Sequence, residues 1–486
     1  MKQVLFIFFF SVYFTGIGQT QIGQNIEGEA SDNRFGSSVS FSADGNILAI
    51  GAPKYDGANG VNTGQVKVYQ NNNGTWSQLG QAIEGEAAGD RFGNSVSLSG
   101  NGNILAVGAP RHDGVNGDDS GDVRVYENIN GTWTQIGLDI NGEAEDDRFG
   151  SSVSLSDDGN ILAVGAPNNE GIFIFINTGH VRVFENINNS WSQIGEDIET
   201  SAQAAQIGHS VSLSADGTIV AIGAPGYGIS AGYVIIYQND NGTWSQIGQG
   251  IEGNTYDEFG TCVRLSSDGN TLAVGAIRRE LATPNNLNYV KVFKYTSNSW
   301  SQVSEKISGE NPSDLFGAVL SLNDEGNVLA VGAPNIYSSD NGYAMIFRNT
   351  SDSWSQIGEK IEGFSTMDQF GSTLSLNSEG NKIAIGEPSF MSEKGYVQIY
   401  DLDGILNNNE VAKIEFSLFP NPASEQFKIQ LEAGDILKNV NLYTTKGRLI
   451  KTSRFYSTDI SNLSKGLYFV EVTSQYGKAT KSLIIK

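Results

Sequence analysis

The sequence predicts an all-β protein, in which a seven-bladed β-propeller is followed by a small β-sandwich. Three observations lead to this prediction. One motif recurs seven times, each copy contains four short β-rich runs, and the composition changes after residue 403. A unit repeated at a nearly constant period cannot bury its apolar face alone, so its copies must pack against one another.

The recurring motif is centred on a Phe-Gly pair. The phenylalanine of this pair stands at six positions, namely Phe35, Phe92, Phe149, Phe259, Phe316 and Phe370. Ile207-Gly208 occupies the corresponding place in the fourth copy, and neighbouring copies are 57, 57, 58, 52, 57 and 54 residues apart. This spacing predicts one supersecondary unit, copied seven times.

Each repeat contains four strand-like runs. In the first repeat they are residues 38–41, which follow Phe-Gly, 47–53, which end in Gly-Ala-Pro, 65–69, and 76–80, which begin with a tryptophan. Asp-Gly, Asn-Gly and other Gly-rich turns between the runs predict antiparallel hairpins. Seven four-stranded units favour a propeller. A solenoid is the alternative, and it would need distinct capping repeats at its ends.

The two ends of the array predict how the ring closes. All six tryptophans occupy the fourth-run position, and the seventh repeat stops after its third run at Tyr400. Residues 19–28 match the fourth-run pattern without the tryptophan. We therefore expect the N-terminal strand to complete the last blade, which leaves no open sheet edge at either end.

Several repeated side chains are interpreted as structural. We expect each fourth-run tryptophan to pack between neighbouring blades and each motif glycine to allow close backbone approach. The aspartate that precedes Phe-Gly is expected to accept hydrogen bonds from turn amides. Cys262 lies in a strand-like run with no partner motif for a nucleophile, so we expect it to be buried.

Phe-Gly followed by Gly-Ala-Pro resembles the FG-GAP repeat of integrin-α-type seven-bladed propellers. The Trp-Ser-Gln-Ile-Gly runs resemble more closely a bacterial FG-GAP-like subgroup, and the resemblance covers residues 19–403. Integrin-type repeats carry an Asp-x-Asp-x-Asp-Gly calcium loop between the first two strands, whereas residues 42–46 hold one carboxylate. Calcium needs six to eight oxygen ligands, so these sites are not carried over and no cofactor is predicted.

The two ends of the chain predict its destination. Residues 1–18 have a lysine, an 11-residue apolar run and small residues, as in a secretory signal peptide too short to span a bilayer. After a linker at 404–412, residues 413–486 resemble the type A C-terminal sorting domain of the type IX secretion system. The resemblance rests on Pro420-Asn421-Pro422, on the Gly-Leu-Tyr-Phe-Val run from Gly466 and on the terminal Lys486. It implies a β-sandwich, contact with that secretion machinery, and release or attachment at the outer surface of a Gram-negative bacterium.

Charge and motifs exclude several functions. With 30 basic and 54 acidic residues, the chain has a net charge of −24, which argues against nucleic acid or an anionic membrane as a partner. The sequence contains no nucleophile elbow, phosphate loop or zinc-protease motif. The three histidines, His112, His180 and His209, lie in different repeats and show no metal-ligand spacing. We therefore predict that the protein is not an enzyme.

The loops between the second and third runs vary most, and variable loops on a rigid scaffold usually carry recognition. Blade links on the same edge add carboxylates, so this face is expected to be acidic. The candidate ligand-binding residues are Asp56, Asp113, Asp118, Asp119, Asp147 and Asp257. The Gly/Asn-rich loops around the first four could hold calcium, although their spacing matches no standard calcium loop.

These features predict a secreted or cell-surface binding or adhesion module whose partner is an extracellular glycan or protein. A propeller-type polysaccharide hydrolase or lyase is the alternative, and a purely structural role in the envelope is the third.

Overall fold

The computed structural model describes residues 18–170, 177–200, 202, 204–277, 287–336, 340–366, 368–406, 416–431, 436–444, 448–474 and 478–486. The chain separates into two compact units, Met1–Gly404 and Ile405–Lys486. Nearly all of the predicted signal peptide (residues 1–17) and most of the predicted linker (407–412) lie outside the described residues. None of the helices in the described part of the chain has the length and apolar character needed to cross a membrane.

In its described residues, unit 1 contains seven antiparallel sheets, which we number as blades 1 to 7 in the order of their innermost strands. These first strands are β3 (Ser38–Phe41), β8 (Ser95–Leu98), β13 (Ser152–Leu155), β18 (Ser210–Leu213), β23 (Phe259–Leu265), β28 (Val319–Leu322) and β32 (Thr373–Leu376). The second strands carry the Gly-Ala-Pro motif or its variants and are β4 (Ile47–Ala52), β9 (Ile104–Ala109), β14 (Ile161–Ala166), β19 (Ile219–Ala224), β24 (Thr271–Ala276), β29 (Val328–Ala333) and β33 (Lys382–Glu387).

The third strands are β5 (Gln65–Asn72), β10 (Asp122–Ile129), β15 (His180–Ile187), β20 (Tyr233–Asp240), β25 (Tyr289–Thr296), β30 (Asn341–Thr350) and β34 (Tyr396–Asp401). The outer strand is continuous in blade 6, as β31 (Ser353–Thr366). In blades 1 to 5 it is divided into two pieces that pair with the same third strand. These pieces are β6 (Thr75–Gln78) and β7 (Ile83–Glu84), β11 (Thr132–Gln135) and β12 (Ile140–Asn141), β16 (Ser190–Gln193) and β17 (Ile198–Glu199), β21 (Thr243–Gln246) and β22 (Ile251–Glu252), and β26 (Ser299–Gln302) and β27 (Ile307–Ser308).

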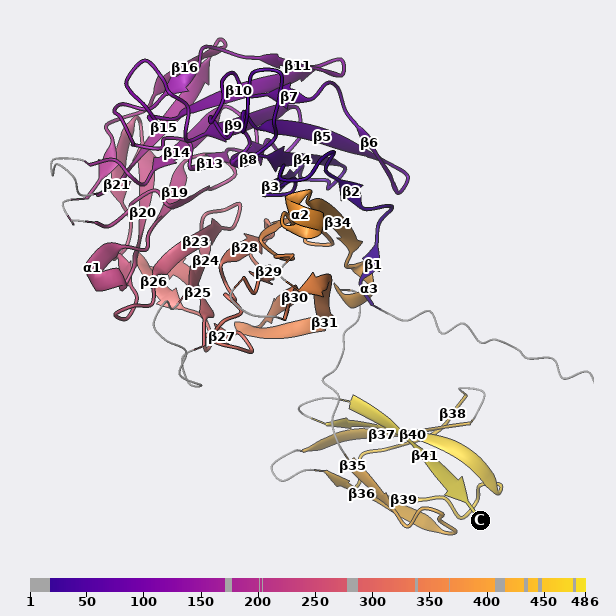
Figure 1. Ribbon diagram of the computed structural model, residues 1–486. Coiled ribbons are helices and arrows are strands. Elements are labelled where there is room, and N and C mark those ends of the chain that lie inside the picture. Colours follow the sequence, from indigo (N-terminus) through magenta and orange to yellow (C-terminus); the bar gives the residue numbers. More distant parts are fainter. Residues whose placement is uncertain are drawn as a thin grey trace, which may run out of the picture. The chain divides into compact units, whose positions relative to one another are not determined.

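The N-terminus supplies the outer strand of blade 7. β1 (Thr20–Gln21) and β2 (Ile26–Glu27) both pair antiparallel with β34, in registers that place Thr20 opposite Asp401 and Ile26 opposite Val397. Each innermost strand contacts that of the next blade, and β32 contacts β3, so the sheets form the closed ring seen in Figure 1. The predicted propeller with an N-terminal closing strand is confirmed.

The motif glycines lie where the backbones of neighbouring blades pack directly against each other. In blade 3, Gly165 of the Gly-Ala-Pro motif has no room for a side chain, because a Cβ atom there would lie 2.0 Å from the carbonyl oxygen of Gly208 in blade 4. The same contact recurs around the ring and closes it, since Gly386 of blade 7 faces the carbonyl of Gly36 in blade 1. Within a blade the two motifs are also joined, as Gly36 N–H donates to Gly51 C=O over 2.9 Å.

The motif aromatics fill the space between strands. Phe92 is fully buried and meets Tyr126 of the third strand edge to face, with ring centroids 6.1 Å apart. Trp133 of blade 2 joins a core cluster with blade 1 and donates from Nε1 to the carbonyl of Leu79 over 2.9 Å. It sits against Gly80, where a Cβ would lie 2.9 Å from the indole. The predicted packing of tryptophan between blades is confirmed, and Cys262 is buried as expected.

Three four-residue helices complete unit 1 and its end. α1 (Tyr227–Ser230) and α2 (Phe390–Glu393) lie in the connections between the second and third strands of blades 4 and 7. α3 (Asp403–Leu406) follows β34.

The described residues of unit 2 form two antiparallel sheets. One contains β35 (Phe416–Phe419), β36 (Gln426–Leu431) and β39 (Ser457–Asp459), and the other contains β38 (Leu449–Ser453), β37 (Leu437–Thr444), β40 (Gly466–Ser474) and β41 (Lys478–Ile485). Buried side chains from both sheets, such as Phe427 and Val470, form one hydrophobic cluster. This is the predicted β-sandwich.

Deleting residues 19–28 is expected to abolish much of the cooperative unfolding of unit 1, because β34 would lose its outer partner and expose an edge. Calorimetry of the chain with and without this segment measures the effect. An unchanged melting transition would show that this strand is not needed to close the ring.

Gly165→Ala is expected to destabilise unit 1 by about 3 kcal/mol or more, because neither glycine backbone at the contact can move without opening the ring. Gly131→Ala is the control, since Gly131 has a positive φ of 83° but no atom within 4 Å of the added methyl. Its cost should be only about 1–2 kcal/mol. Equal losses in denaturant unfolding would contradict the importance of the glycine contact.

Candidate functional site

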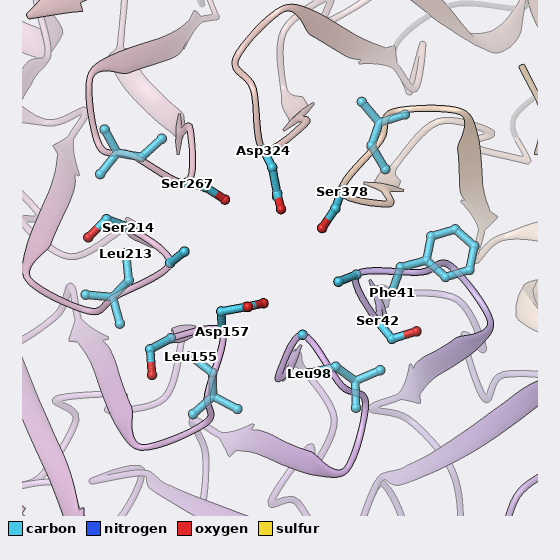
Figure 2. A pocket seen from close by; sticks show the side chains of 16 residues that line it. Phe41, Ser42, Leu98, Leu155, Asp157, Leu213, Ser214, Ser267, Asp324 and Ser378 are labelled. Carbon is cyan, nitrogen blue, oxygen red and sulfur yellow. The ribbon is translucent and has the colours of Figure 1, made fainter. Parts of the chain in front are cut away.

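One pocket lies on the propeller axis, at the ends of the first strands. Its volume is about 160 Å³, and all seven blades contribute residues to its lining. Figure 2 shows the side chains of Asp157, Asp324, Ser267 and Ser378 directed toward the centre of this pocket. The pKa of Asp157 is raised, because the carboxyl group is partly desolvated and lies near Asp324.

A closed circle of backbone hydrogen bonds surrounds this pocket. Each blade donates one N–H to a carbonyl of the following blade, over 2.8 to 3.2 Å. The residues of the circle, in order, are Ala43, Gly100, Asp157, Ala215, Ser267, Asp324 and Ser378, whose N–H returns to Ala43. These hydrogen bonds between blades fix the backbone at this end of the axis. The seven residues that form them carry different side chains in different blades.

The Phe-Gly motifs and the loops between second and third strands lie at the other end of the first strands. The aspartates before Phe-Gly do not make this face acidic, because Asp90, Asp147, Asp257 and Asp314 are at most 1% exposed. Asp314 shows their role, since its carboxylate accepts the N–H groups of Glu310, Asn311 and Phe316. They satisfy turn amides, as expected. Other carboxylates of the blade links are exposed, namely Glu29, Asp32, Glu86, Glu143 and Asp146, so the acidic face stays a prediction.

This burial also bears on two predicted ligand-binding residues. Asp147 accepts hydrogen bonds from Ala144 N–H and Asn169 Nδ2, at 2.9 and 3.1 Å. Asp257 accepts from Asn254 and from the hydroxyl of Tyr289. Because both carboxylates are buried within their own blades, Asp147 and Asp257 do not reach the loop surface, and they are removed from the candidate set.

The other four predicted residues lie on two equivalent loops. Asp56 Oδ1 accepts the N–H of Asn62 at 2.8 Å, and Asp113 Oδ1 accepts the N–H of Asp119 at 2.9 Å, so both close their loops. Asp118 is exposed. Carbonyl groups of these loops also accept hydrogen bonds from the link that leads into the next blade. The carbonyl of Asn62, for example, accepts from the N–H of Arg91. Ligand binding by these four residues stays a prediction.

Basic side chains gather on this face around the axis. Arg34, Arg91 and Arg148 directly precede Phe-Gly in blades 1 to 3, all with positive φ between 53° and 56°. Arg111 follows the second strand of blade 2. The pKa of Arg91 is lowered by burial and by the charges of Arg111, Arg148 and Arg34, as expected for neighbouring cations.

Two carboxylates partly neutralise these groups. Glu393 of α2 accepts two hydrogen bonds from the guanidinium of Arg34, at 2.7 and 2.5 Å, and one from Lys54 at 2.9 Å. These contacts lower the pKa of Glu393 to about 2. Asp119 Oδ2 lies 4.0 Å from Arg111 and 3.9 Å from Arg148. We call Arg34, Lys54, Arg91, Arg111 and Arg148 the arginine cluster.

A different group of side chains forms in blade 3. One ligand atom each of Glu143, His180 and Asp197 lies within 4.8 Å of the other two. The imidazole of His180 is 1% exposed, and burial beside Arg182 lowers its pKa. Arg182 donates to Glu143 Oε1 and to Asn141 C=O, at 3.2 and 2.6 Å.

Comparison with known families agrees with this architecture. Residues 83–126 match the FG-GAP repeat, and residues 417–486 match the secretion system C-terminal sorting domain. The chain therefore contains an FG-GAP repeat and a type IX sorting domain. The sorting domain directs export by the type IX system to the cell surface or extracellular space, and it implies contact with that machinery.

A search of curated proteins finds no match to the chain. Among solved structures, the chain is similar to a candidate 6-phosphogluconolactonase from Bacteroides fragilis, with 14% identity and a TM-score of 0.44. That similarity covers 68% of this chain and 85% of the other. No conclusion about activity or ligand follows from it.

The FG-GAP sequence did not reveal two of these groupings. The arginines before Phe-Gly were visible as a recurring residue type, but their convergence depends on the curvature of the ring. His180 is separated by 37 residues from Glu143 and by 17 from Asp197, so no local spacing links them. Among the described residues, this is the one group of three such side chains close enough to share a metal ion.

Blade 7 of the FG-GAP propeller contains a buried carboxyl group at the end of its second strand. Glu387 takes the place of the alanine in Gly-Ala-Pro and is 0% exposed. Burial, with the nearby carboxylate of Asp368, raises the pKa of Glu387 to about 8. The group is therefore largely protonated in the folded protein at neutral pH.

This shift predicts that stability falls as pH rises. Since the folded pKa exceeds the unfolded value, the native state binds more protons between about pH 5 and 8, and the slope can reach about 1.4 kcal/mol per pH unit. Glu387→Gln should flatten this dependence in denaturant titrations of unit 1. A wild-type slope retained in the variant would contradict the assignment, and Glu379→Gln, an exposed residue of the same blade, is the control.

Proposed function

We propose that this protein is a secreted or surface-attached recognition module that binds an anionic extracellular glycan on its Phe-Gly face. The single observation behind the proposal is the arginine cluster. Five basic side chains share two carboxylates at one end of the axis, in a protein with a net charge of −24. Guanidinium groups bind carboxylate, sulfate and phosphate oxygens through paired hydrogen bonds.

The accessibility of the cluster supports this role. The side chains of Arg34, Arg111 and Arg148 are 35%, 36% and 38% exposed, so a ligand can reach them. Arg111 and Arg148 lie at the outer limit of an ion pair with Asp119, and the Nε atom of Arg148 is buried without a hydrogen-bond partner. A ligand oxyanion could accept hydrogen bonds from Arg111 and Arg148, because Asp119 satisfies these two guanidinium groups only in part.

The scaffold supports recognition by a preformed surface. The arginines extend from backbone that is fixed by hydrogen bonds to the preceding loop, such as Arg148 N–H to Asp119 C=O at 3.1 Å. A rigid backbone reduces the conformational entropy that binding must overcome. The uronate or sulfate groups of an acidic polysaccharide match the charge of the cluster, and an acidic protein surface is the competing partner.

A specific observation also favours the hydrolase or lyase alternative. Asp157 and Asp324 face the axial pocket from different blades, and paired carboxylates are the usual catalytic groups of glycoside hydrolases. The pocket volume of about 160 Å³ leaves little room for a sugar chain, which makes catalysis there the weaker candidate.

The test is binding of the secreted chain to uronate-rich, sulfated and neutral polysaccharides, with product release followed in the same samples. Arg111→Gln with Arg148→Gln is expected to weaken anionic binding by at least about tenfold, since a hydrogen bond to a charged group contributes about 1.5–3 kcal/mol. Lys294→Gln, a charge loss at an exposed site in blade 5, should leave binding unchanged.

Each result has a distinct meaning. Equal binding to neutral and acidic polysaccharides, or binding unaffected by the double substitution, would overturn the proposal. Product release lost in Asp157→Asn or Asp324→Asn would establish the enzyme alternative. Binding only to acidic proteins would reassign the partner.

A further inference from the structure

Blade 3 contains a buried histidine whose nitrogens make no hydrogen bond. His180 is 1% exposed, and neither Nδ1 nor Nε2 has a partner. Burying a polar group without a partner is unfavourable, because the group loses its hydrogen bonds to water. Blades 5 and 6 avoid this cost at the equivalent position, where Tyr289 and Tyr343 donate their hydroxyl hydrogens to Asp257 and Asp314.

Two carboxylates face this histidine from other segments of the chain. Glu143 comes from the link that leads into blade 3, and Asp197 lies between the two outer-strand pieces β16 and β17. Their ligand atoms and one nitrogen of His180 are all within 4.8 Å of one another. We propose that Glu143, His180 and Asp197 bind one divalent transition-metal ion of the zinc class.

The choice of metal follows from the ligand types. An imidazole nitrogen suits zinc, nickel and copper, whereas calcium takes oxygen ligands throughout. Three protein ligands leave a coordination position for water or for an oxygen of another molecule. The imidazole must be neutral to bind a metal ion, and both of its nitrogens lack a hydrogen-bond partner.

The three ligand atoms lie within 4.8 Å of one another, and ligands about 2.0–2.2 Å from a zinc ion would be at most about 4.4 Å apart. The two carboxylates can adjust to a bound ion, since Glu143 is exposed and Asp197 is half-buried, while His180 is fixed in β15. Gln193 already orients Asp197 by donating to Oδ1 over 2.6 Å, as outer-shell groups do in metal sites.

Arg182 is compatible with a bound ion. Its guanidinium lies over the ring of Phe149, with Cζ 4.4 Å from the centroid, and donates to Asn141 C=O. It engages the Oε1 atom of Glu143, and a carboxylate has a second oxygen for a cation. The negative charges of Asp197, Asp147 and Glu199 near Glu143 outnumber this single positive charge.

Blade 2 provides an internal comparison. Glu86, Asp139 and Arg124 occupy the places of Glu143, Asp197 and Arg182, but Asp122 replaces the histidine. Arg124 pairs with all three carboxylates, at 3.2, 3.5 and 2.8 Å. In blade 2 the arginine thus neutralises the group, whereas in blade 3 the histidine remains without a partner.

The experiment is titration of the tag-free chain, lacking residues 1–18, with Zn²⁺ by calorimetry and with Co²⁺ by visible absorption. We expect about one ion per chain at micromolar affinity or tighter, as typical zinc sites achieve at neutral pH. His180→Gln, which introduces the residue that blade 1 has at this position, should weaken binding at least about tenfold, and so should Asp197→Asn. The Co²⁺ spectrum of the wild type should report nitrogen and oxygen ligands.

His112→Gln is the matched control, because His112 lies in blade 2 against Asp90 and outside the proposed site. It should bind Zn²⁺ as the wild type does. The proposal is overturned if the wild type shows no saturable binding, or if either site variant binds as tightly as the wild type. Asp197→Asn, a partly exposed change, keeps the test decisive if His180→Gln does not fold.

Discussion

Neighbouring blades meet at a contact between two glycine backbones, and the rest of the propeller depends on it. The Cα of a Gly-Ala-Pro glycine lies against the carbonyl of the next Phe-Gly glycine, with no space for a methyl group. This contact brings the first strands close enough for serines such as Ser38 to donate from Oγ to that same carbonyl, at 2.8 Å. It also brings the strand-ending turns close enough to complete the backbone circle around the axis.

Tight packing near the axis gives the two ends of the ring different chemistry. At one end, seven backbone hydrogen bonds occupy the polar groups and leave a narrow pocket. At the other end, the Phe-Gly turns bury an aspartate in most blades. The residue directly before Phe-Gly points its side chain outward. In three neighbouring blades that side chain is an arginine, so the curvature of the ring concentrates positive charge on an acidic protein.

Because the backbone is copied from blade to blade, single substitutions create local chemistry without changing the scaffold. The third-strand residue that pairs with the last residue of the second strand illustrates this, since it differs around the ring: Gln65, Asp122, His180, Tyr233, Tyr289, Tyr343 and Tyr396. Each environment is nearly the same, so the side chain decides whether the position holds a hydrogen bond, an ion pair or an unpartnered imidazole. Glu387 is a similar case, in which one carboxyl replaces a methyl group in a conserved contact.

The sequence by itself determined the repeat, the strand order within each blade, the closing strand at the N-terminus and the sorting domain at the C-terminus. These features follow from local patterns and from complementary ends, such as residues 19–28 and the blade that stops at Tyr400. Only the tertiary structure decided which charges meet. Asp147 and Asp257 are buried because their carboxylates accept hydrogen bonds from turn amides. The sequence does not show whether such a carboxylate binds a turn amide or faces solvent. The arginine cluster arises because the ring brings neighbouring blades together. The Glu143–His180–Asp197 group arises because strand pairing within blade 3 brings three separate segments together. The spacing of these residues in the sequence shows neither arrangement.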